Sequence, residues 1–131
     1  MVKKGYILIE LLIAIEIFVV VLSFSLDFFI NQIHFFSRHS EKLDANINAR
    51  IAIEFLSDKI RNASNIVITG DTVYVDNKKI YLKNDVLIYD YSSVPIANKI
   101  SRFSVNFIGK GLYEINVDSF YTSYTVVVRN R

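Results

Sequence analysis

The chain begins with a long apolar segment that few polar residues interrupt. The 25 residues from Tyr6 to Ile30 are mainly aliphatic or aromatic. As a helix rising about 1.5 Å per residue, they would extend about 38 Å, and the hydrocarbon core of a bilayer is about 30 Å thick. Because no second apolar run of this length follows, we predict a single transmembrane segment at residues 6–30.

Beyond residue 30, apolar residues recur mainly every third or fourth position, which is the period of an amphipathic helix. No Gly or Pro interrupts residues 6–62. We therefore predict one helix that ends at about residue 63 and packs the apolar face of its second half on the rest of the chain. The apolar positions of this half are Ile33, Phe36, Leu43, Ile47, Ile51, Ile53, Leu56, Ile60 and Ala63.

After residue 65 the apolar positions alternate, and polar turn residues separate short segments, as in an antiparallel sheet. The predicted strands are Ile66–Thr69, Thr72–Val75, Lys79–Lys83, Val86–Tyr89, Phe103–Ile108, Leu112–Val117 and Thr122–Arg129. Turns are predicted at Gly70-Asp71, Asp76-Asn77, Asn84-Asp85 and Gly109–Gly111. The segment Ser92–Asn98, which contains Pro95, is predicted to be a loop.

The alternation also predicts which side chains cover the helix and which face water. The fold class is therefore α+β, with one long N-terminal helix packed on a C-terminal antiparallel sheet, and residues 31–131 form the domain outside the membrane segment. Predicted to face the helix are Val73, Val75, Ile80, Leu82, Phe103, Val105, Phe107, Tyr113, Ile115 and Val117. Predicted to face water are Lys79, Lys83, Ser104, Asn106, Glu114 and Asn116.

One carboxylate, that of Glu10, lies within the apolar segment. A charged residue near the centre of an inserted helix costs about 2.5 to 3.5 kcal/mol, so an acid at this position indicates a function. The structural alternative is that Glu10 lies near the lipid headgroups and has no role. Its surroundings favour a function: Lys3 and Lys4, then Gly5, Tyr6, three aliphatic residues and the glutamate.

This arrangement resembles the class III signal of type IV prepilins and pseudopilins. The resemblance implies that a membrane-embedded prepilin peptidase cuts between Gly5 and Tyr6, removes the leader at residues 1–5 and methylates the new amino group of Tyr6. Members of the family more often have Phe where this chain has Tyr6. The resemblance also implies a pilin-like fold, other pilin or pseudopilin subunits as partners, and an assembly platform in the inner membrane.

Cleavage would create a charge pair. Tyr6 and Glu10 are four residues apart and share a helix face, so the new ammonium group would lie near the carboxylate. In the family, the glutamate of an incoming subunit pairs with the amine of a subunit already in the filament. Because an unpaired charge is costly in a medium of low dielectric constant, this pairing would set the register of assembly.

The charges flanking the apolar segment predict its orientation. Lys3 and Lys4 precede it, so the positive-inside tendency places the N-terminus in the cytoplasm and the domain outside. The net charge of +2 becomes 0 when these two lysines are removed, which gives no electrostatic reason to expect a nucleic-acid partner. The alternative is a secretory signal peptide ending near Ser23-Phe24-Ser25, but Glu10 and Glu16 interrupt the core that such a peptide keeps uncharged.

The stretch Asn48–Ala63 and the final strand are similar to those of J-type pseudopilins of type II secretion and W-type minor pilins. A competence pseudopilin is the nearest alternative, and an ordinary amphipathic helix would show the same charge spacing. Major pilins usually carry a Pro in the later part of the apolar segment and often a disulfide, whereas this chain has no cysteine and its one proline is Pro95. A minor pilin or pseudopilin is therefore favoured over a principal subunit.

A second set of polar residues follows one line along the predicted helix. Glu16, Ser23, Asp27 and His34 lie within about 20° of one line along the helix at about 100° per residue, and Glu10 lies about 120° away from it. Glu16 and Asp27 are candidate partner-facing residues. The alternative is that Asp27 and His34 lie at the membrane interface and Glu16 is merely tolerated.

The sequence shows no pattern for catalysis, a metal or a cofactor. His34 and His39 do not share a helix face, and the four glycines form no phosphate-binding pattern. Asp71, Asp76, Asp85 and Asp90 fit no dedicated calcium loop and are interpreted as turn residues. We therefore expect no enzymatic activity.

Two functions remain open at this point. The first is a minor pilin or pseudopilin at or near the tip of a filament used for type II secretion, competence or a type IV pilus. The second is a single-pass membrane protein whose extracytoplasmic domain binds a ligand and never polymerises.

Overall fold

A computed structural model describes residues 2–90 and 93–131, and within them the chain forms one helix and eight strands. Met1 of the predicted leader and Ser92 of the predicted loop lie outside the described residues. The chain divides into two compact units, which meet between Ser40 and Glu41.

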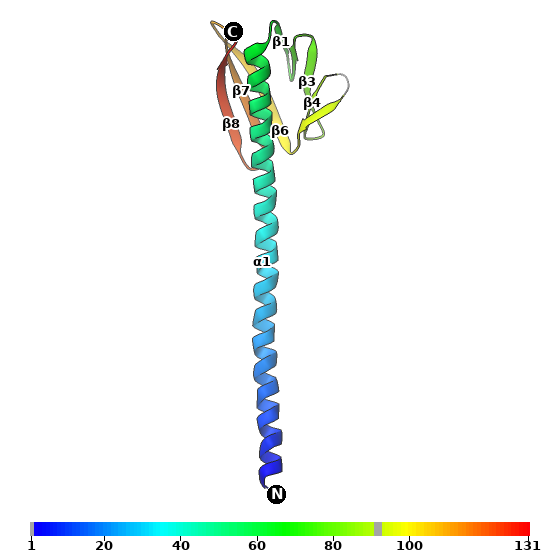
Figure 1. Cartoon of the computed structure of the whole chain (residues 1–131), viewed down its shortest axis with the longest axis vertical. Helices are drawn as coiled ribbons and strands as arrows, with labels where there is room; N and C mark the ends of the chain where they lie inside the picture. The colour runs from blue at the N-terminus through cyan, green and yellow to red at the C-terminus, as the bar shows by residue number, and fades with distance from the viewer. Residues whose placement is uncertain (1, 91–92) are drawn as a thin grey trace. The chain divides into compact units, whose positions relative to one another are not determined.

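The helix α1 runs without interruption from Val2 to Asn62 (Figure 1). The part of α1 that lies in the first unit, up to Ser40, exposes almost all of its aliphatic and aromatic side chains. The helix is long and apolar enough to cross a membrane, as the sequence predicts. It begins at Val2, so the described residues of the predicted leader are helical as well.

The end of α1 is closed by a residue from the other end of the domain. The side-chain amide of Asn130 donates to the carbonyl oxygens of Ile60 at 2.5 Å and Ala63 at 3.0 Å. The backbone N–H of Arg131 donates to the carbonyl of Arg61 at 3.2 Å. Carbonyl groups in the last turn of a helix have no hydrogen-bond donor within the helix. These three contacts supply donors to the carbonyls at the end of α1.

Five short strands form the first sheet, in the order β1-β2-β3-β4-β5, and every neighbouring pair is antiparallel. The strands are β1 Ile66–Thr69, β2 Thr72–Val75, β3 Lys78–Lys83, β4 Val86–Tyr89 and β5 Val94–Ala97. Both residues of the Asp76-Asn77 and Asn84-Asp85 turns have positive φ angles. This is the geometry of tight two-residue hairpins, so both predicted turns are confirmed.

The strand β5 corrects the prediction of a loop at Ser92–Asn98. Val94–Ala97 pairs with β4, where Pro95 lies opposite Ile88. A proline has no N–H to donate and is tolerated at the edge of a sheet, which is where β5 lies. The proline therefore marks an edge strand and not a loop.

Three longer strands form a second antiparallel sheet, in the order β6-β7-β8. They are β6 Ile100–Gly109, β7 Leu112–Ser119 and β8 Ser123–Arg129. The turn between β6 and β7 includes Gly109, whose φ of 126° is open to glycine and strained for other residues. The sequence predicts one sheet, and the structure has two.

The part of α1 within the second unit packs against both sheets. Figure 1 shows the green end of α1 with β8 on one side and the labels of β1, β3 and β4 on the other. This is the predicted α+β arrangement, and it is consistent with a pilin-like fold. The buried core draws on all three layers: Ala49, Ala52, Ile53, Leu56, Ile60 and Ala63; Val73, Val75, Ile80, Leu87 and Ala97; Ile100, Phe103, Val105, Ile115, Val117 and Val128.

The face of α1 that packs on the sheets agrees only in part with the predicted one. Ile53, Leu56, Ile60 and Ala63 are buried as predicted, and the earlier positions differ. Ala45, Ala49 and Ala52 are fully buried, whereas Leu43, Ile47 and Ile51 are 62%, 49% and 44% exposed. At about 100° per residue, the two sets lie on opposite sides of the helix. The small alanine side chains allow a close approach of helix to sheet, and the second unit leaves the larger aliphatic residues uncovered.

Most strand positions face as predicted. Val73, Val75, Ile80, Phe103 and Val105 are buried, as are Ile115 and Val117, while Leu82 and Tyr113 pack against the core. The exception is Phe107, which is 60% exposed. Phe107 pairs with Tyr113 near the turn, and the centres of their rings lie 5.2 Å apart. The strand register shifts at a bulge between Phe107 and Gly109.

Candidate processing and assembly site

Gly5, the predicted cleavage residue, lies inside the continuous helix α1. A Cβ atom at this position would meet no heavy atom within 4 Å. Glycine inside a helix costs about 0.5–1 kcal/mol relative to alanine, so a glycine with free space around it is not explained by packing. The fold itself therefore does not require Gly5.

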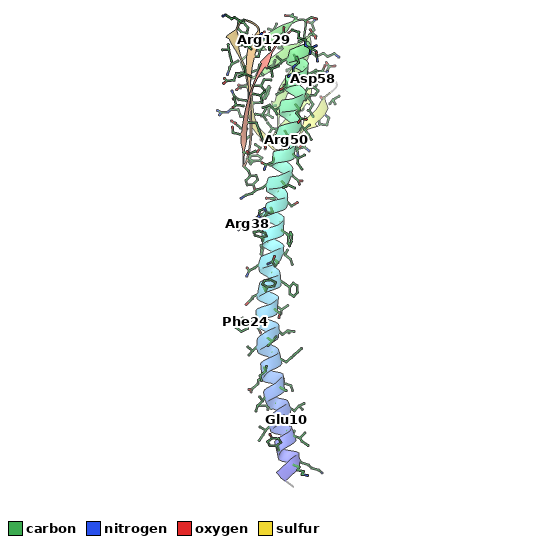
Figure 2. The ribbon with its side chains drawn as sticks, turned by 60° about the vertical axis from the view of Figure 1, so that its left-hand side comes forward. Glu10, Phe24, Arg38, Arg50, Asp58 and Arg129 are labelled. Carbon is green, nitrogen blue, oxygen red and sulfur yellow. The ribbon has the colours of Figure 1, made fainter. Side chains whose placement is uncertain are left out.

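Tyr6 and Glu10 occupy the same face of α1, four residues apart. Both side chains are exposed, Tyr6 by 68%. Figure 2 shows Glu10 on the surface of the helix. The structure thus places the predicted cleavage and assembly residues together on one accessible face.

Glu10 has no complementary charge close to it on the helix. The positions three and four residues away carry Tyr6, Ile7, Ile13 and Ala14. Among the described residues, no ion pair or hydrogen bond involves the Glu10 carboxylate. The described chain therefore leaves the Glu10 carboxylate without a complementary charge.

The second polar line also lies on exposed helix, but its members differ. The hydroxyl of Ser23 donates to the carbonyl of Val19 at 2.8 Å and is satisfied within the helix. For Glu16 and Asp27, both exposed, the described residues provide no ion pair or hydrogen bond. Because α1 is continuous, the predicted alignment of Glu16 and Asp27 on one side is retained.

The second unit holds a polar hollow that the sequence analysis did not identify. It has a volume of about 220 Å³ and is lined by Arg102, Ser104, Asn116, Asp118 and Ser123, on the outer face of the second sheet. The guanidinium of Arg102 donates to Asp118 through Nη2 at 3.0 Å and Nε at 3.2 Å, and the Ser123 hydroxyl donates to the other carboxylate oxygen.

These contacts perturb the Asp118 carboxyl. The hydrogen bond from Ser123 holds the pKa of Asp118 below the ordinary value of 3.8. Burial raises this pKa, and the hydrogen bond and charge of Arg102 lower it further. The partners of Asp118 lie 5 and 16 residues away on neighbouring strands, so no local sequence pattern reveals them. Arg102 and Ser123 thus satisfy the Asp118 carboxylate, and Asn116 accepts a hydrogen bond from Thr125 beside the hollow.

The turn aspartates include one with a clear structural role. Asp76 accepts hydrogen bonds from the backbone N–H groups of Ser64 and Asn65 at 2.8 and 2.9 Å. These groups follow the end of α1, so Asp76 fixes the path from the helix into the first sheet. In the described part of the chain, no cluster of three or more His, Cys, Asp or Glu side chains could hold a metal ion.

Several lysines lie over aromatic rings of the first sheet, a feature that the sequence analysis also missed. Lys59 lies 5.2 Å from the ring centre of Tyr89, and Lys79 lies 4.5 Å from that of Tyr81. Such contacts stabilise by about 0.5–1 kcal/mol at exposed sites. The lysines and tyrosines are thus engaged within the domain.

Comparison of the chain with protein-family models, with curated proteins and with solved structures found no match.

Proposed function

We propose that this chain is a minor pilin or pseudopilin. Its precursor is cut between Gly5 and Tyr6 by a prepilin peptidase, methylated at the new amino group of Tyr6, and incorporated at or near the tip of a filament. The observation that carries the proposal is the isolated carboxylate of Glu10, exposed on an apolar helix one turn from Tyr6.

The physical reason is the cost of that charge. An unpaired carboxylate in the membrane costs about 2.5 to 3.5 kcal/mol near the helix centre, and an ammonium group beside it recovers much of this. The intact chain has a peptide bond at Tyr6, and cleavage converts its nitrogen into an amine. A neighbouring subunit carries the same pair, so the charges can be satisfied between chains as well as within one.

Gly5 supports the same proposal from a different direction. Neither packing nor backbone conformation requires a glycine there. A residue without a side chain is needed where another protein's active site must approach the backbone closely. Recognition by a peptidase accounts for Gly5.

The exposed face of α1 in the second unit supports packing between subunits. Leu43, Ile47 and Ile51 form an apolar stripe on the side opposite the core. This stripe lies beyond the predicted membrane segment, where water would otherwise contact it. Helices of neighbouring subunits would cover it in a filament.

The proposal includes an orientation and a choice of contacts. Lys3 and Lys4 hold the N-terminus in the cytoplasm, and the domain lies outside the inner membrane before assembly. Glu16 and Asp27 face partner subunits. The filament belongs to a type II secretion, competence or type IV pilus system, and the chain serves it as a structural subunit and not as an enzyme.

Mass spectrometry of the membrane fraction tests the processing step. The expected product begins at Tyr6 and carries one methyl group on its amine. An intact Met1 would contradict the proposal and favour the anchored binding protein that never polymerises.

The substitution Glu10→Val tests the assembly step. Removing the charge lowers the cost of insertion, so we expect normal membrane insertion and at least about a tenfold loss of incorporation into filaments, since 1.4 kcal/mol corresponds to a factor of 10. Ile9→Val is the matched control at an exposed neighbouring position and should leave incorporation unchanged. Filament yield can be measured by shearing or by crosslinking to other subunits, and normal incorporation of Glu10→Val would refute the assigned role.

A further inference from the structure

The two sheets of the domain have four outer strands, and three of them carry features that prevent further pairing. Exposed sheet edges offer unpaired N–H and C=O groups to other chains, and proteins protect them by shortness, proline, charge, bulges or a covering element. The outer strands here are β1 and β5 of the first sheet and β6 and β8 of the second.

Each of the first three strands is protected in its own way. The strands β1 and β5 have four residues each, and β5 contains Pro95. The strand β6 has register shifts near both ends and lies against β3. Its first residue, Ile100, also donates a backbone hydrogen bond to the carbonyl of Asp85 at 3.0 Å.

The strand β8 lacks the shortness, proline and bulges that protect the other three. Its seven residues, Ser123–Arg129, pair with β7 in continuous register and contain no proline and no lysine. The middle is Thr125, Val126 and Val127, all β-branched, and the two valines are 37% and 54% exposed on opposite faces. Arg129 is the one charged residue of the strand. In the described part of the chain, β8 has one strand neighbour, β7.

We propose that β8 is a pairing edge for β8 of a second copy of this chain. The two strands run antiparallel with Val126 opposite Val126, and they join the two three-stranded sheets into one of six strands. The backbone groups of the free edge then find hydrogen-bond partners, as in recognition by strand addition.

The sequence of β8 is complementary to itself in this register. Thr125 lies opposite Val127, and Tyr124 lies opposite Val128, so each cross-strand pair joins side chains of the same face. Arg129 lies opposite Ser123, which keeps the two arginines at opposite ends of the paired strands. Like charges directly opposite each other are destabilising, and this register has none.

This contact joins two copies of the chain and leaves no equivalent edge for a third. Within residues 2–90 and 93–131 each chain has one such edge, and a twofold axis at Val126 uses the same surface on both partners. The inference goes beyond the proposed function, because it concerns the domain alone and requires neither cleavage at Gly5 nor the charge of Glu10.

Cysteine crosslinking of the full-length chain in membranes tests the register, since the natural chain has no cysteine. A chain with Val126→Cys is treated with a short thiol crosslinker, and we expect most of it to form a dimer. Val67→Cys on β1, which is similarly exposed at 46%, is the control and should stay monomeric. A mixture of Thr125→Cys and Val127→Cys chains should crosslink more than either chain alone.

A second substitution, added to the Val126→Cys chain, tests the edge itself. Val127→Lys places a charge on an exposed residue, so the fold should persist, and crosslinking through the thiol introduced by Val126→Cys should fall at least about tenfold. Val127→Thr, which keeps the β-branched shape, should retain the crosslink. Crosslinking should also persist when Glu10→Val is added, which separates this inference from filament assembly.

Two outcomes would each overturn the proposal. The first is crosslinking of the Val126→Cys chain to a different polypeptide. The second is a yield of dimer no higher than that of the Val67→Cys chain.

Discussion

The polar side chains of Asn130, Asp118 and Glu10 differ in whether the described chain supplies a hydrogen-bond or charge partner. Asn130 and Asp118 have theirs inside the second unit, whereas the described chain offers none to Glu10. Glu10 stands out in the sequence because its neighbours are all apolar, which is a local property. Asn130 and Asp118 could not be predicted, because strand pairing and helix packing bring their partners from distant positions.

Asp118 provides a test that depends on pH. Its pKa is lowered in the folded chain, so ionisation of this carboxyl stabilises the fold above the ordinary value of 3.8, and the contribution is lost as the pH falls through the folded pKa. Asp118→Asn should therefore lower stability at neutral pH, by less than about 1 kcal/mol because the Arg102 side chain is largely exposed. Thermal unfolding in detergent should show this difference shrinking at acidic pH.

The control for this test is Glu114→Gln, a change on the same face of β7. In the described residues Glu114 has no ion pair, so its removal should change stability by no more than about 0.5 kcal/mol. A deficit of Asp118→Asn that stayed constant down to strongly acidic pH would contradict the role given to ionisation.

At the scale of elements, the alternating pattern predicts where the strands lie but not how they are divided between sheets. The bounds of β1, β2 and β4 are those predicted, because tight turns lie beside them. The division into two sheets depends on which strands pair, and no local pattern encodes that. The buried face of α1 was predicted correctly from Ile53 onward and missed before it. Two apolar stripes compete in that earlier part, and its exposed aliphatic residues are larger than the alanines that pack on the sheets.

The two stripes predict opposite consequences for mutations only two residues apart. Ile47→Lys alters an exposed position, so the free energy of unfolding should change by no more than about 0.5 kcal/mol while incorporation into filaments is lost. Ala49→Leu adds volume at a fully buried position and should destabilise the domain by about 1–3 kcal/mol. Chemical denaturation and filament yield measure the two effects. Normal filament yield from Ile47→Lys would contradict the proposal that this stripe packs between subunits.

At the scale of the whole molecule, the chain combines an apolar helix with a domain that has its own core. The sequence places the boundary at about residue 31 from the change in composition, whereas the compact units meet between Ser40 and Glu41. The difference arises because polar residues enter the helix before its contacts with the sheets begin, and the first fully buried residue of α1 is Ala45.

The predicted orientation can be tested by reversing the charges at the start of the helix. Lys3→Glu combined with Lys4→Glu replaces the positive charges that precede the apolar segment, so a substantial fraction of chains should insert with the domain on the cytoplasmic side. Protease added to the outside of spheroplasts would then fail to digest that fraction. Lys110→Glu, a charge change in the turn between β6 and β7, is the control and should leave every domain accessible. Full accessibility of the double variant would show that these lysines do not set the orientation.

The cap supplied by Asn130 also orders events in time. The carbonyls of Ile60 and Ala63 receive it from a residue that is synthesised 70 and 67 positions later. A chain synthesised from its N-terminus therefore presents α1 first and the group that caps α1 almost last. Closing such a long loop is slow compared with forming the helix. The domain is complete only when β8 and the residues after it have been made, so the fold itself distinguishes finished chains from chains still being synthesised.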